Sequence, residues 1–248
     1  MDLQLRDHVV IITGGTSGIG AATALALASE GACPVLIGLD PMPDNLAAAL
    51  TATGVRYGHH AVDLRDHTAV AAIVAEVIAT FGRIDGLVNN AGINDRVDLM
   101  AGPAAFTASL ERNLIHYYTM AHLTLSSLIQ STGAIVNVAS KTALTGQGDT
   151  SGYCASKGGV SALTRALATE YDVPIRICAV APGGVETNMY SAFIPPKGAD
   201  WGRMRKMSRD NVEVGKPAEL ASFYAYLGSD EARYVSGATL MMDGGISC

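Results

Sequence analysis

The chain has 248 residues, 49% of them hydrophobic, and a formal net charge of -6 at pH 7. An acidic chain without a basic stripe is a poor candidate for nucleic-acid binding. The longest apolar-rich run, residues 69–81, contains Glu76 and is too short to span a bilayer. No positively charged segment followed by an apolar one opens the chain, so we expect no signal peptide and a cytoplasmic protein. We predict that it binds neither membranes nor nucleic acid.

The cysteines and histidines are scattered along the chain. Cys33, Cys154, Cys178 and Cys248 show neither a CxxC spacing nor a Cys/His pattern typical of a metal site. In a chain of this length, such cysteines are expected to be reduced thiols. We therefore predict no disulfide framework and no bound metal.

Short apolar runs alternate with segments of helical periodicity. The expected strands are residues 8–13, 34–38, 55–61, 84–89, 134–139, 175–180 and 238–243. The expected helices are residues 18–30, 43–53, 66–81, 103–130, 152–172 and 216–228. Continuously apolar strands are typical of a parallel sheet that is covered on both faces, and strict alternation implies right-handed crossovers. The pattern predicts a single α/β domain over residues 1–248, with a doubly wound, seven-stranded parallel sheet of the Rossmann type.

Residues 183–215 are the least regular segment. They contain Pro195, Pro196 and the only tryptophan of the chain. A long irregular segment in a compact α/β domain is often a functional lid. We predict a substrate lid at about residues 186–214; the alternative is a solvated loop with short helical turns.

The first expected strand ends in a glycine-rich turn, TGGTSGIG at residues 13–20. Glycine lets a backbone turn tightly and come close to a ligand. The helix that follows offers unpaired N–H groups and a partial positive charge, which suit a pyrophosphate. Such a turn can also be a plain strand–helix connection, but its place after the first strand favours dinucleotide binding. The residues expected to contact the cofactor here are Gly14, Ser17, Gly18, Ile19 and Gly20.

The end of the second expected strand predicts which nucleotide binds. A carboxylate there accepts hydrogen bonds from the ribose hydroxyls of NAD and repels the 2′-phosphate of NADP, which an arginine favours. Gly38 and Leu39 offer no arginine, whereas Asp40 and Asp44 are acidic. We predict NAD rather than NADP, with Asp40 as the contact. Alternatively, Asp40 caps the helix expected to begin near Pro43.

A series of short motifs follows in a specific order. They are TGGTSGIG (13–20), NNAG (89–92), Asn113, Ser140, YCASK (153–157), PGGVET (182–187) and MMDGG (241–245). In this order, and over essentially the whole chain, they resemble the short-chain dehydrogenase/reductases. The most specific part is the step of thirteen residues from Ser140 to Tyr153, then of four to Lys157. The resemblance implies an oxidoreductase that uses a nicotinamide cofactor.

Tyr153 and Lys157 are about one helical turn apart, so they share a helix face and can point into one cleft. A free tyrosine has a pKa of about 10. Acid–base chemistry near neutrality requires this pKa to fall by roughly three units, or about 4 kcal/mol. One ammonium about 4 Å away supplies about 4 kcal/mol at an effective dielectric constant of about 20. We therefore expect Lys157 to lower the pKa of Tyr153.

The resemblance implies a role for each of four residues. Tyr153 would exchange a proton with the substrate hydroxyl, and Lys157 would also hold the nicotinamide ribose. Ser140 would hydrogen-bond the reacting oxygen, and Asn113 would hold a water molecule in a proton relay. Taken singly, each has a plain structural alternative, such as a solvated helix charge or the end of a strand. Their order and spacing together favour the catalytic interpretation.

The resemblance also implies cofactor contacts beyond the carboxyl ends of later strands, where ligands bind in parallel sheets. They are Asp63 and Leu64 beside the adenine, Asn90 and Gly92 on the adenosine side, Pro182, Gly183, Val185 and Thr187 beside the nicotinamide, and Tyr153 and Lys157 themselves. The backbone of Val185 is expected to meet the carboxamide.

Polar residues surround the expected catalytic group. A steroid or acyl pocket is lined mainly by apolar groups, so a polar set favours a small polyhydroxylated substrate, although some of these residues can instead cap loops. The residues expected to bind substrate are Asn94, Ser140, Thr142, Gln147, Tyr153 and Asn188. Segments 109–122 and 140–158 also resemble bacterial L-fucose dehydrogenases, which oxidise the anomeric hydroxyl of an aldose to the lactone. Those enzymes carry an arginine where this chain has Leu39.

Two other functions are possible for a chain with this pattern. A 3-oxoacyl or other ketone reductase of the same fold would use Arg203, Arg205, Lys206 and Arg209 to attract an acidic carrier protein. The missing arginine at the second strand argues against an NADPH-dependent reductase. The intact catalytic residues argue against a nucleotide-binding module without catalysis. The resemblance further implies a homodimer or homotetramer.

Overall fold

The computed structural model describes residues 2–171, 174–193 and 213–247. They form one α/β domain around a seven-stranded parallel sheet with the strand order β3-β2-β1-β4-β5-β6-β7. The strands are β1 (Val9–Thr13), β2 (Cys33–Gly38), β3 (Gly58–Ala61), β4 (Gly86–Asn89), β5 (Ala134–Val138), β6 (Arg176–Pro182) and β7 (Thr239–Met242). The predicted fold class is confirmed. Residues 194–212 of the predicted lid lie outside the described residues.

Helices form in every segment where the sequence predicted one. They are α1 (Gly18–Ser29), α2 (Asp44–Ala52), α3 (His67–Phe81), α4 (Gly102–Leu110), α5 (His116–Ser131), α7 (Ser151–Glu170) and α9 (Pro217–Gly228). The short helix α6 (Thr142–Thr145) and the 3-10 turns η1 (Leu99–Ala101), η3 (Asn188–Phe193) and η5 (Asp230–Ala232) are additional. Within the described ranges, no helix has both the length and the apolar character needed to cross a bilayer.

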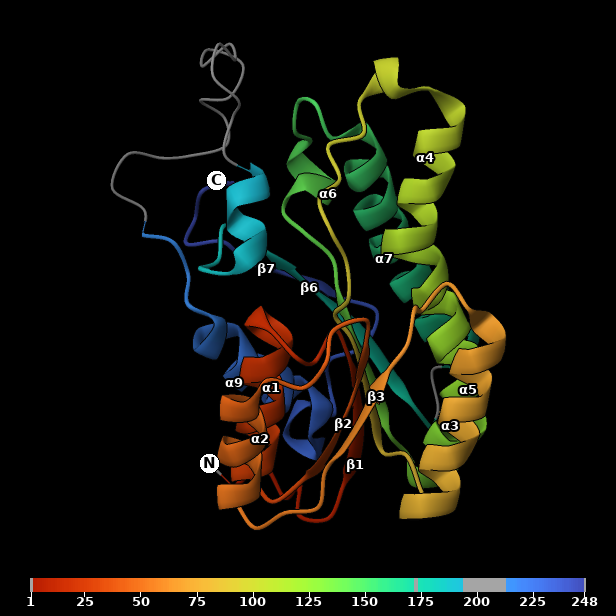
Figure 1. Cartoon of the computed structure of the whole chain (residues 1–248), viewed down its shortest axis with the longest axis vertical. Helices are drawn as coiled ribbons and strands as arrows, with labels where there is room; N and C mark the ends of the chain where they lie inside the picture. The colour runs from red at the N-terminus through yellow and green to blue at the C-terminus, as the bar shows by residue number, and fades with distance from the viewer. Residues whose placement is uncertain (1, 172–173, 194–212, 248) are drawn as a thin grey trace.

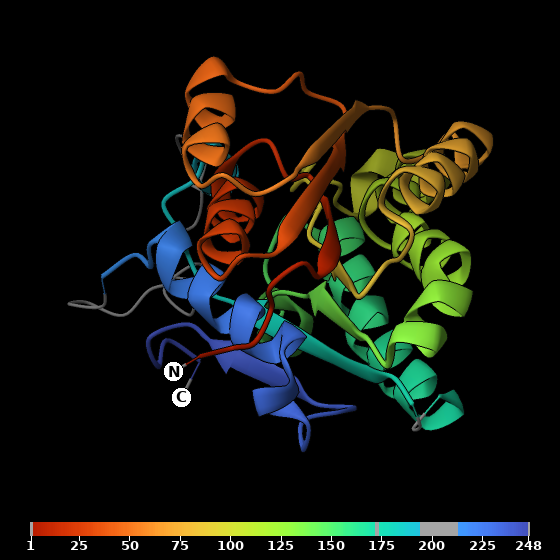
Figure 2. The same cartoon turned by 90° about the horizontal axis from the view of Figure 1, so that it is seen from below.

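Helices cover both faces of the sheet: α1, α2 and α9 lie on one side, and α3, α5 and α7 on the other (Figure 2). Successive residues of a strand point to opposite faces. In β1, Val10 and Ile12 therefore join the core beneath α1 and α9, whereas Val9 and Ile11 join the core beneath α3 and α5. Burial on both faces is the physical reason why the strand runs are continuously apolar.

The chain reverses its direction of travel across the sheet between β1 and β4. These two strands are neighbours, although β2 and β3 separate them in the sequence. The connections that leave their carboxyl ends diverge, and such a switch point leaves a crevice that ligands fill. Figure 1 shows α6 and the upper part of α4 standing beyond this edge of the sheet.

The long helix expected over residues 103–130 is divided in the structure. The end of α4 passes into one π-helical segment, η2 (Glu111–Ile115), which then continues as α5. A π-helical segment adds a residue to a helical turn and changes which side chains face the sheet. Asn113 lies in the middle of η2, so this local change decides where that side chain points.

Arg176 in β6 provides a stability test, because its buried guanidinium binds backbone carbonyls around the end of α9. It donates to Leu227 O at 2.8 Å, Ser229 O at 2.8 Å and Ala232 O at 3.3 Å, and the last turn of α9 has no basic residue of its own. We expect Arg176→Met to lower the free energy of unfolding by about 3 kcal/mol, since the carbonyls lose a charged donor. Urea unfolding measures this.

The matched control is Arg233→Met, which removes an exposed arginine from the neighbouring turn. Surface substitutions usually change stability by less than about 0.5 kcal/mol. Equal stability of the two variants would show that Arg176 does not hold the end of α9.

Candidate active site

A cavity of about 750 Å³ opens at the carboxyl edge of the sheet. Most of the residues expected to bind cofactor or substrate line it. They are Gly14, Ser17, Gly18, Ile19, Asp40, Asp63, Leu64, Asn90, Gly92, Ser140, Thr142, Gln147, Tyr153, Lys157, Pro182, Gly183, Val185, Thr187 and Asn188. Gly20, Asn94 and Asn113 do not line the cavity.

The glycine turn is built for close approach of the backbone. Gly14 and Gly18 have φ values of 63° and 51°, a region that glycine enters without steric cost. Asn90 braces the turn by donating to Thr13 O at 3.0 Å and Gly14 O at 3.3 Å. The first turn of α1 contains no acidic residue, so no carboxylate competes for its N–H groups. This cradle fits a pyrophosphate.

Gly20 has a packing role in addition to the cofactor contact expected of it. A Cβ atom at this position would lie 2.2 Å from Gly14 O and 2.7 Å from Asn90 Nδ2. Gly20 therefore lets α1 pack directly beneath the turn, and its expected contact with the cofactor stays a prediction.

The two carboxylates expected at the adenosine end differ in their surroundings. Asp63 makes hydrogen bonds with Arg65, whose Nε lies 3.0 Å from Oδ1 and 3.1 Å from Oδ2. These bonds lower the pKa of Asp63. Asp40 is exposed and lines the cavity next to Leu39. Because α2 begins at Asp44 with Pro43 at its N-cap, Asp40 does not cap that helix.

Ser140, Tyr153 and Lys157 come together from the end of β5 and the first turns of α7. The Tyr153 hydroxyl is hydrogen-bonded to Ser140. Ser140 Oγ also accepts hydrogen bonds from the backbone N–H of Thr142 at 3.2 Å and from its hydroxyl at 3.0 Å. Thr142 is only 3% exposed, so its hydroxyl orients Ser140. The three catalytic side chains predicted from the sequence thus share one wall of the cavity.

The electrostatics of Tyr153 differ from the expectation. Burial raises the pKa of Tyr153 to about 12, and the Ser140 hydrogen bond lowers it only in part. Lys157 Nζ is bound to Val138 O at 2.7 Å and to Tyr117 Oη at 2.8 Å, and it lies 5.8 Å from the centre of the Tyr153 ring. Burial lowers the pKa of Lys157 to about 7. Lys157 alone therefore does not offset the desolvation of the phenol.

Asn113 is fully buried, and both ends of its amide are bound within the protein. Its Oδ1 accepts from the backbone N–H of Ile93 at 2.7 Å, and its Nδ2 donates to Ser109 O at 3.1 Å. Through these two bonds, Asn113 fixes the loop that follows β4 against η2. The role expected for Asn113, holding a water molecule in the proton relay, stays a prediction.

Asn94 was expected to bind substrate, but it is 4% exposed and joins two loops. Its Nδ2 donates to Ala192 O at 3.3 Å, and its Oδ1 accepts from the backbone N–H of Arg96 at 3.2 Å. Arg96 Nε also donates to Ala192 O, at 3.0 Å. The pair attaches the loop after β4 to the end of η3.

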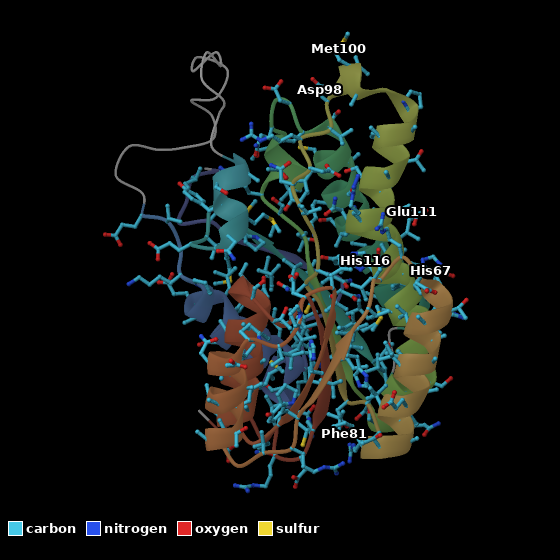
Figure 3. The ribbon with its side chains drawn as sticks, in the orientation of Figure 1. His67, Phe81, Asp98, Met100, Glu111 and His116 are labelled. Carbon is cyan, nitrogen blue, oxygen red and sulfur yellow. The ribbon has the colours of Figure 1, made fainter. Side chains whose placement is uncertain are left out.

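Sequence reasoning missed two residues at the start of α5. Tyr117 is fully buried and binds Lys157. His116 lines the cavity, and burial lowers its pKa to about 3, so the imidazole is neutral. Figure 3 shows His116 in the interior, where α5 begins beside the sheet. The four-residue step from Asn113 to Tyr117 was a signal for a shared helix face. No metal-binding group of three or more His, Cys, Asp or Glu side chains occurs in the described ranges.

Comparison with known proteins agrees with this geometry. The family model described as enoyl-(acyl carrier protein) reductase matches residues 14–247. The chain is 37% identical over 257 residues to levodione reductase of Leifsonia aquatica, covering 98% of this chain and 96% of the relative. It is 35% identical over 253 residues to cis-4-hydroxycyclohexanecarboxylate dehydrogenase of Sinomonas cyclohexanicum, covering 99% and 98%. The chain is a short-chain dehydrogenase/reductase.

Solved structures of short-chain dehydrogenase/reductases share the whole fold. Levodione reductase superimposes with a TM-score of 0.87 and 35% identity over 98% of both chains. Aldohexose dehydrogenase of Thermoplasma acidophilum gives a TM-score of 0.83 and 30% identity, covering 100% of this chain and 96% of the other. A short-chain dehydrogenase of Mycobacterium paratuberculosis bound to NAD gives 0.87 and 25%, covering 98% and 99%. The chain is thus an oxidoreductase of the class that acts on alcohols and ketones with a nicotinamide cofactor.

Proposed function

We propose that the chain is an NAD-dependent dehydrogenase that oxidises the anomeric hydroxyl of an aldose, such as L-fucose, to the lactone. The observation that carries this proposal is the meeting of Ser140, Tyr153 and Lys157 with the glycine turn in one cavity. The likeness to an aldohexose dehydrogenase supports a sugar substrate.

Two polar side chains of the cavity, Gln147 and Asn188, support the same substrate class. Both side chains line the cavity; Gln147 precedes Tyr153 in the sequence, and Asn188 follows it. Gln147 Oε1 is buried and has no hydrogen-bond partner among the described residues. An unpaired buried acceptor carries a desolvation cost that a donor on a ligand removes. A sugar hydroxyl is such a donor.

In the proposed reaction, Ser140 holds the anomeric oxygen and Tyr153 removes its proton. The nicotinamide accepts the hydride when the cofactor is bound. Lys157 holds the nicotinamide ribose and, in its protonated form, provides positive charge beside the phenol. Because burial raises the pKa of Tyr153 to about 12, we expect oxidation to become faster as the pH rises and the phenolate form is populated.

The residues proposed to hold the cofactor surround the cavity from the glycine turn to the catalytic wall. They are Gly14, Ser17, Gly18, Ile19, Asp40, Asp63, Leu64, Asn90, Gly92, Pro182, Gly183, Val185 and Thr187, with Tyr153 and Lys157. Because Arg65 binds Asp63, that carboxylate is partly occupied at the adenine end.

Asp40 supports the preference for NAD, because it is the acidic residue that lines the cavity after β2. We expect Asp40→Ser to raise kcat/KM for NADP relative to NAD by on the order of 10-fold, since the charge that repels a 2′-phosphate is lost. Initial rates with both cofactors measure the ratio. Asp44→Ser, on the first turn of α2, is the control and should leave the ratio unchanged. An unchanged ratio in Asp40→Ser would show that Asp40 does not select the cofactor.

The proposal is tested by incubating the purified protein with L-fucose and following the absorbance of reduced nicotinamide with NAD and NADP in parallel. Turnover with NAD supports both parts of the proposal. Turnover only with NADP keeps the substrate and rejects the role of Asp40. Binding of both nucleotides without turnover rejects L-fucose and leads to a panel of other alcohols and ketones.

A 3-oxoacyl or other ketone reductase is the second candidate, because the matching family model is described as a reductase that acts on an acyl carrier protein. The basic residues expected to attract a carrier (Arg203, Arg205, Lys206 and Arg209) lie outside the described residues. Oxidation of NADPH with an acyl thioester, faster than reduction of NAD with any sugar, would favour this candidate. A nucleotide-binding module without catalysis would show binding and no turnover. A cytoplasmic homodimer or homotetramer stays a prediction.

A further inference from the structure

Lys157 is held by partners other than Tyr153. Its side chain is 2% exposed and crosses from α7 to the carboxyl ends of β4 and β5. There Nζ donates to Val138 O at 2.7 Å and to Tyr117 Oη at 2.8 Å. The position of this ammonium is therefore set by the end of β5 and by one side chain of α5.

The Tyr117 hydroxyl lies at a junction of three elements. It is 3.0 Å from Val138 O at the end of β5 and 3.2 Å from Ala91 O after β4, and it accepts from Lys157. One hydroxyl has one proton and two lone pairs, so its proton goes to the carbonyls and a lone pair faces the ammonium. The ring also lies 4.8 Å from Nζ, within the range of a cation–π contact.

The surroundings keep Tyr117 in its neutral form. The residue is fully buried, and burial raises its pKa well above the ordinary value. The ionisable groups near Lys157 are Tyr117 and His116 from α5 and Tyr153 from its own helix. His116 is neutral because burial lowers its pKa to about 3. An acceptor aimed at the charged form of a group favours that form, and Tyr117 supplies one to Lys157.

Neighbouring atoms leave the Lys157 ammonium little room to move. A Cβ atom at Gly92 would lie 3.3 Å from Lys157 Nζ and 3.0 Å from Asn113 Oδ1. Gly92 thus closes one side of the ammonium, Tyr117 and Val138 close another, and the cavity lies beyond. A shift of the ammonium by even about 1 Å would change its distance to both the phenol and a bound ribose.

We propose that Tyr117 is a positioning residue for catalysis, whose hydroxyl holds the Lys157 ammonium between the ends of β4 and β5 so that its charge serves Tyr153 and the nicotinamide ribose together. This inference rests on the roles proposed above for Tyr153 and Lys157. It adds a second tyrosine, which never meets the substrate and acts through the lysine.

The test is Tyr117→Phe, which removes one oxygen atom and keeps the ring that packs beside Lys157. We expect kcat/KM for sugar oxidation to fall on the order of 10-fold, the usual effect of losing a hydrogen bond to a charged group, and NAD to bind roughly threefold to tenfold more weakly. The acid limb of the pH profile for oxidation should move up by about one unit, because the phenolate of Tyr153 loses part of its positive partner. A merely structural role would not move this limb.

The matched control is Tyr224→Phe. Tyr224 on α9 is 1% exposed and does not line the cavity, and its hydroxyl has no hydrogen-bond partner among the described residues. Both variants lose a buried phenolic oxygen, so Tyr224→Phe shows what that loss alone does to stability. Comparing the melting temperatures of the two variants then shows whether Tyr117→Phe is folded. Tyr224→Phe should keep the wild-type NAD affinity and pH profile.

The outcomes separate this inference from the proposed function. In the first case, the wild-type protein oxidises the sugar and Tyr153→Phe does not. If Tyr117→Phe then keeps the wild-type NAD affinity and pH profile, only the role of Tyr117 is overturned. If the wild-type protein turns over no substrate, the NAD titration decides: weaker binding in Tyr117→Phe than in Tyr224→Phe supports the inference, and equal binding overturns it. If Tyr117→Phe does not fold, NMR of the wild-type protein tests the contact itself, and a Lys157 ammonium that makes no hydrogen bond to the Tyr117 hydroxyl overturns the proposal.

Discussion

A Tyr153→Phe variant is expected to lose between about 10²- and 10⁴-fold in kcat, the usual contribution of a positioned general acid or base. Tyr153 is only 5% exposed, and phenylalanine keeps its buried ring. The substitution removes only the hydroxyl that is hydrogen-bonded to Ser140. NAD should still bind, because the glycine turn and Lys157 are untouched. Steady-state rates and a nucleotide titration measure the two effects separately.

The control is Tyr118→Phe on α5, where the ring is 56% exposed and lies outside the cavity. It should turn over at the wild-type rate. Normal turnover by Tyr153→Phe would show that another group exchanges the proton. If Tyr153→Phe loses both turnover and NAD binding, the phenol hydroxyl instead supports the cofactor site as a whole.

Local patterns predicted the sheet, the glycine turn and the pairing of Tyr153 with Lys157, and the family resemblance implied most of the other site residues. A strand buried on both faces is apolar throughout, as in β1, so its extent can be read from a few consecutive residues. The glycine turn is also local, because it joins β1 to α1. The step from Ser140 to Lys157 is local as well, because it runs from the end of β5 into α7. The carboxyl ends of parallel strands meet at one edge, which agrees with the cofactor contacts that the family resemblance implied at the ends of the later strands.

The remaining features depend on contacts between segments distant in sequence. A periodicity near 3.6 residues does not reveal the single extra residue of η2, which turns Asn113 toward Ile93. The sequence also showed Lys157 only with its helical neighbour Tyr153, whereas its hydrogen bonds reach Tyr117 and Val138, 40 and 19 residues away in sequence. The raised pKa of Tyr153 follows from burial, which the spacing of the motif does not contain.

A Gly20→Ala variant is expected to bind NAD on the order of 10- to 100-fold more weakly and to be about 1–3 kcal/mol less stable. The added Cβ would lie 2.2 Å from Gly14 O and 2.9 Å from the carbonyl carbon of the same residue. These are backbone atoms, so the turn itself must move. Because that turn is the expected pyrophosphate cradle, the displacement changes cofactor affinity even though Gly20 does not line the cavity. Calorimetric titration with NAD and urea unfolding measure the two changes.

The sign of the effect makes this test decisive, since alanine is ordinarily better than glycine inside a helix by about 1 kcal/mol. Gly228→Ala at the end of α9 is the matched control, because a Cβ atom there meets nothing within 4 Å. That variant should bind NAD normally and be at least as stable as the wild type. If Gly20→Ala keeps both the NAD affinity and the stability of the wild type, the turn accommodates the methyl group without a change in the cradle. If only the stability falls and the NAD affinity is unchanged, the role of Gly20 is confined to packing of α1.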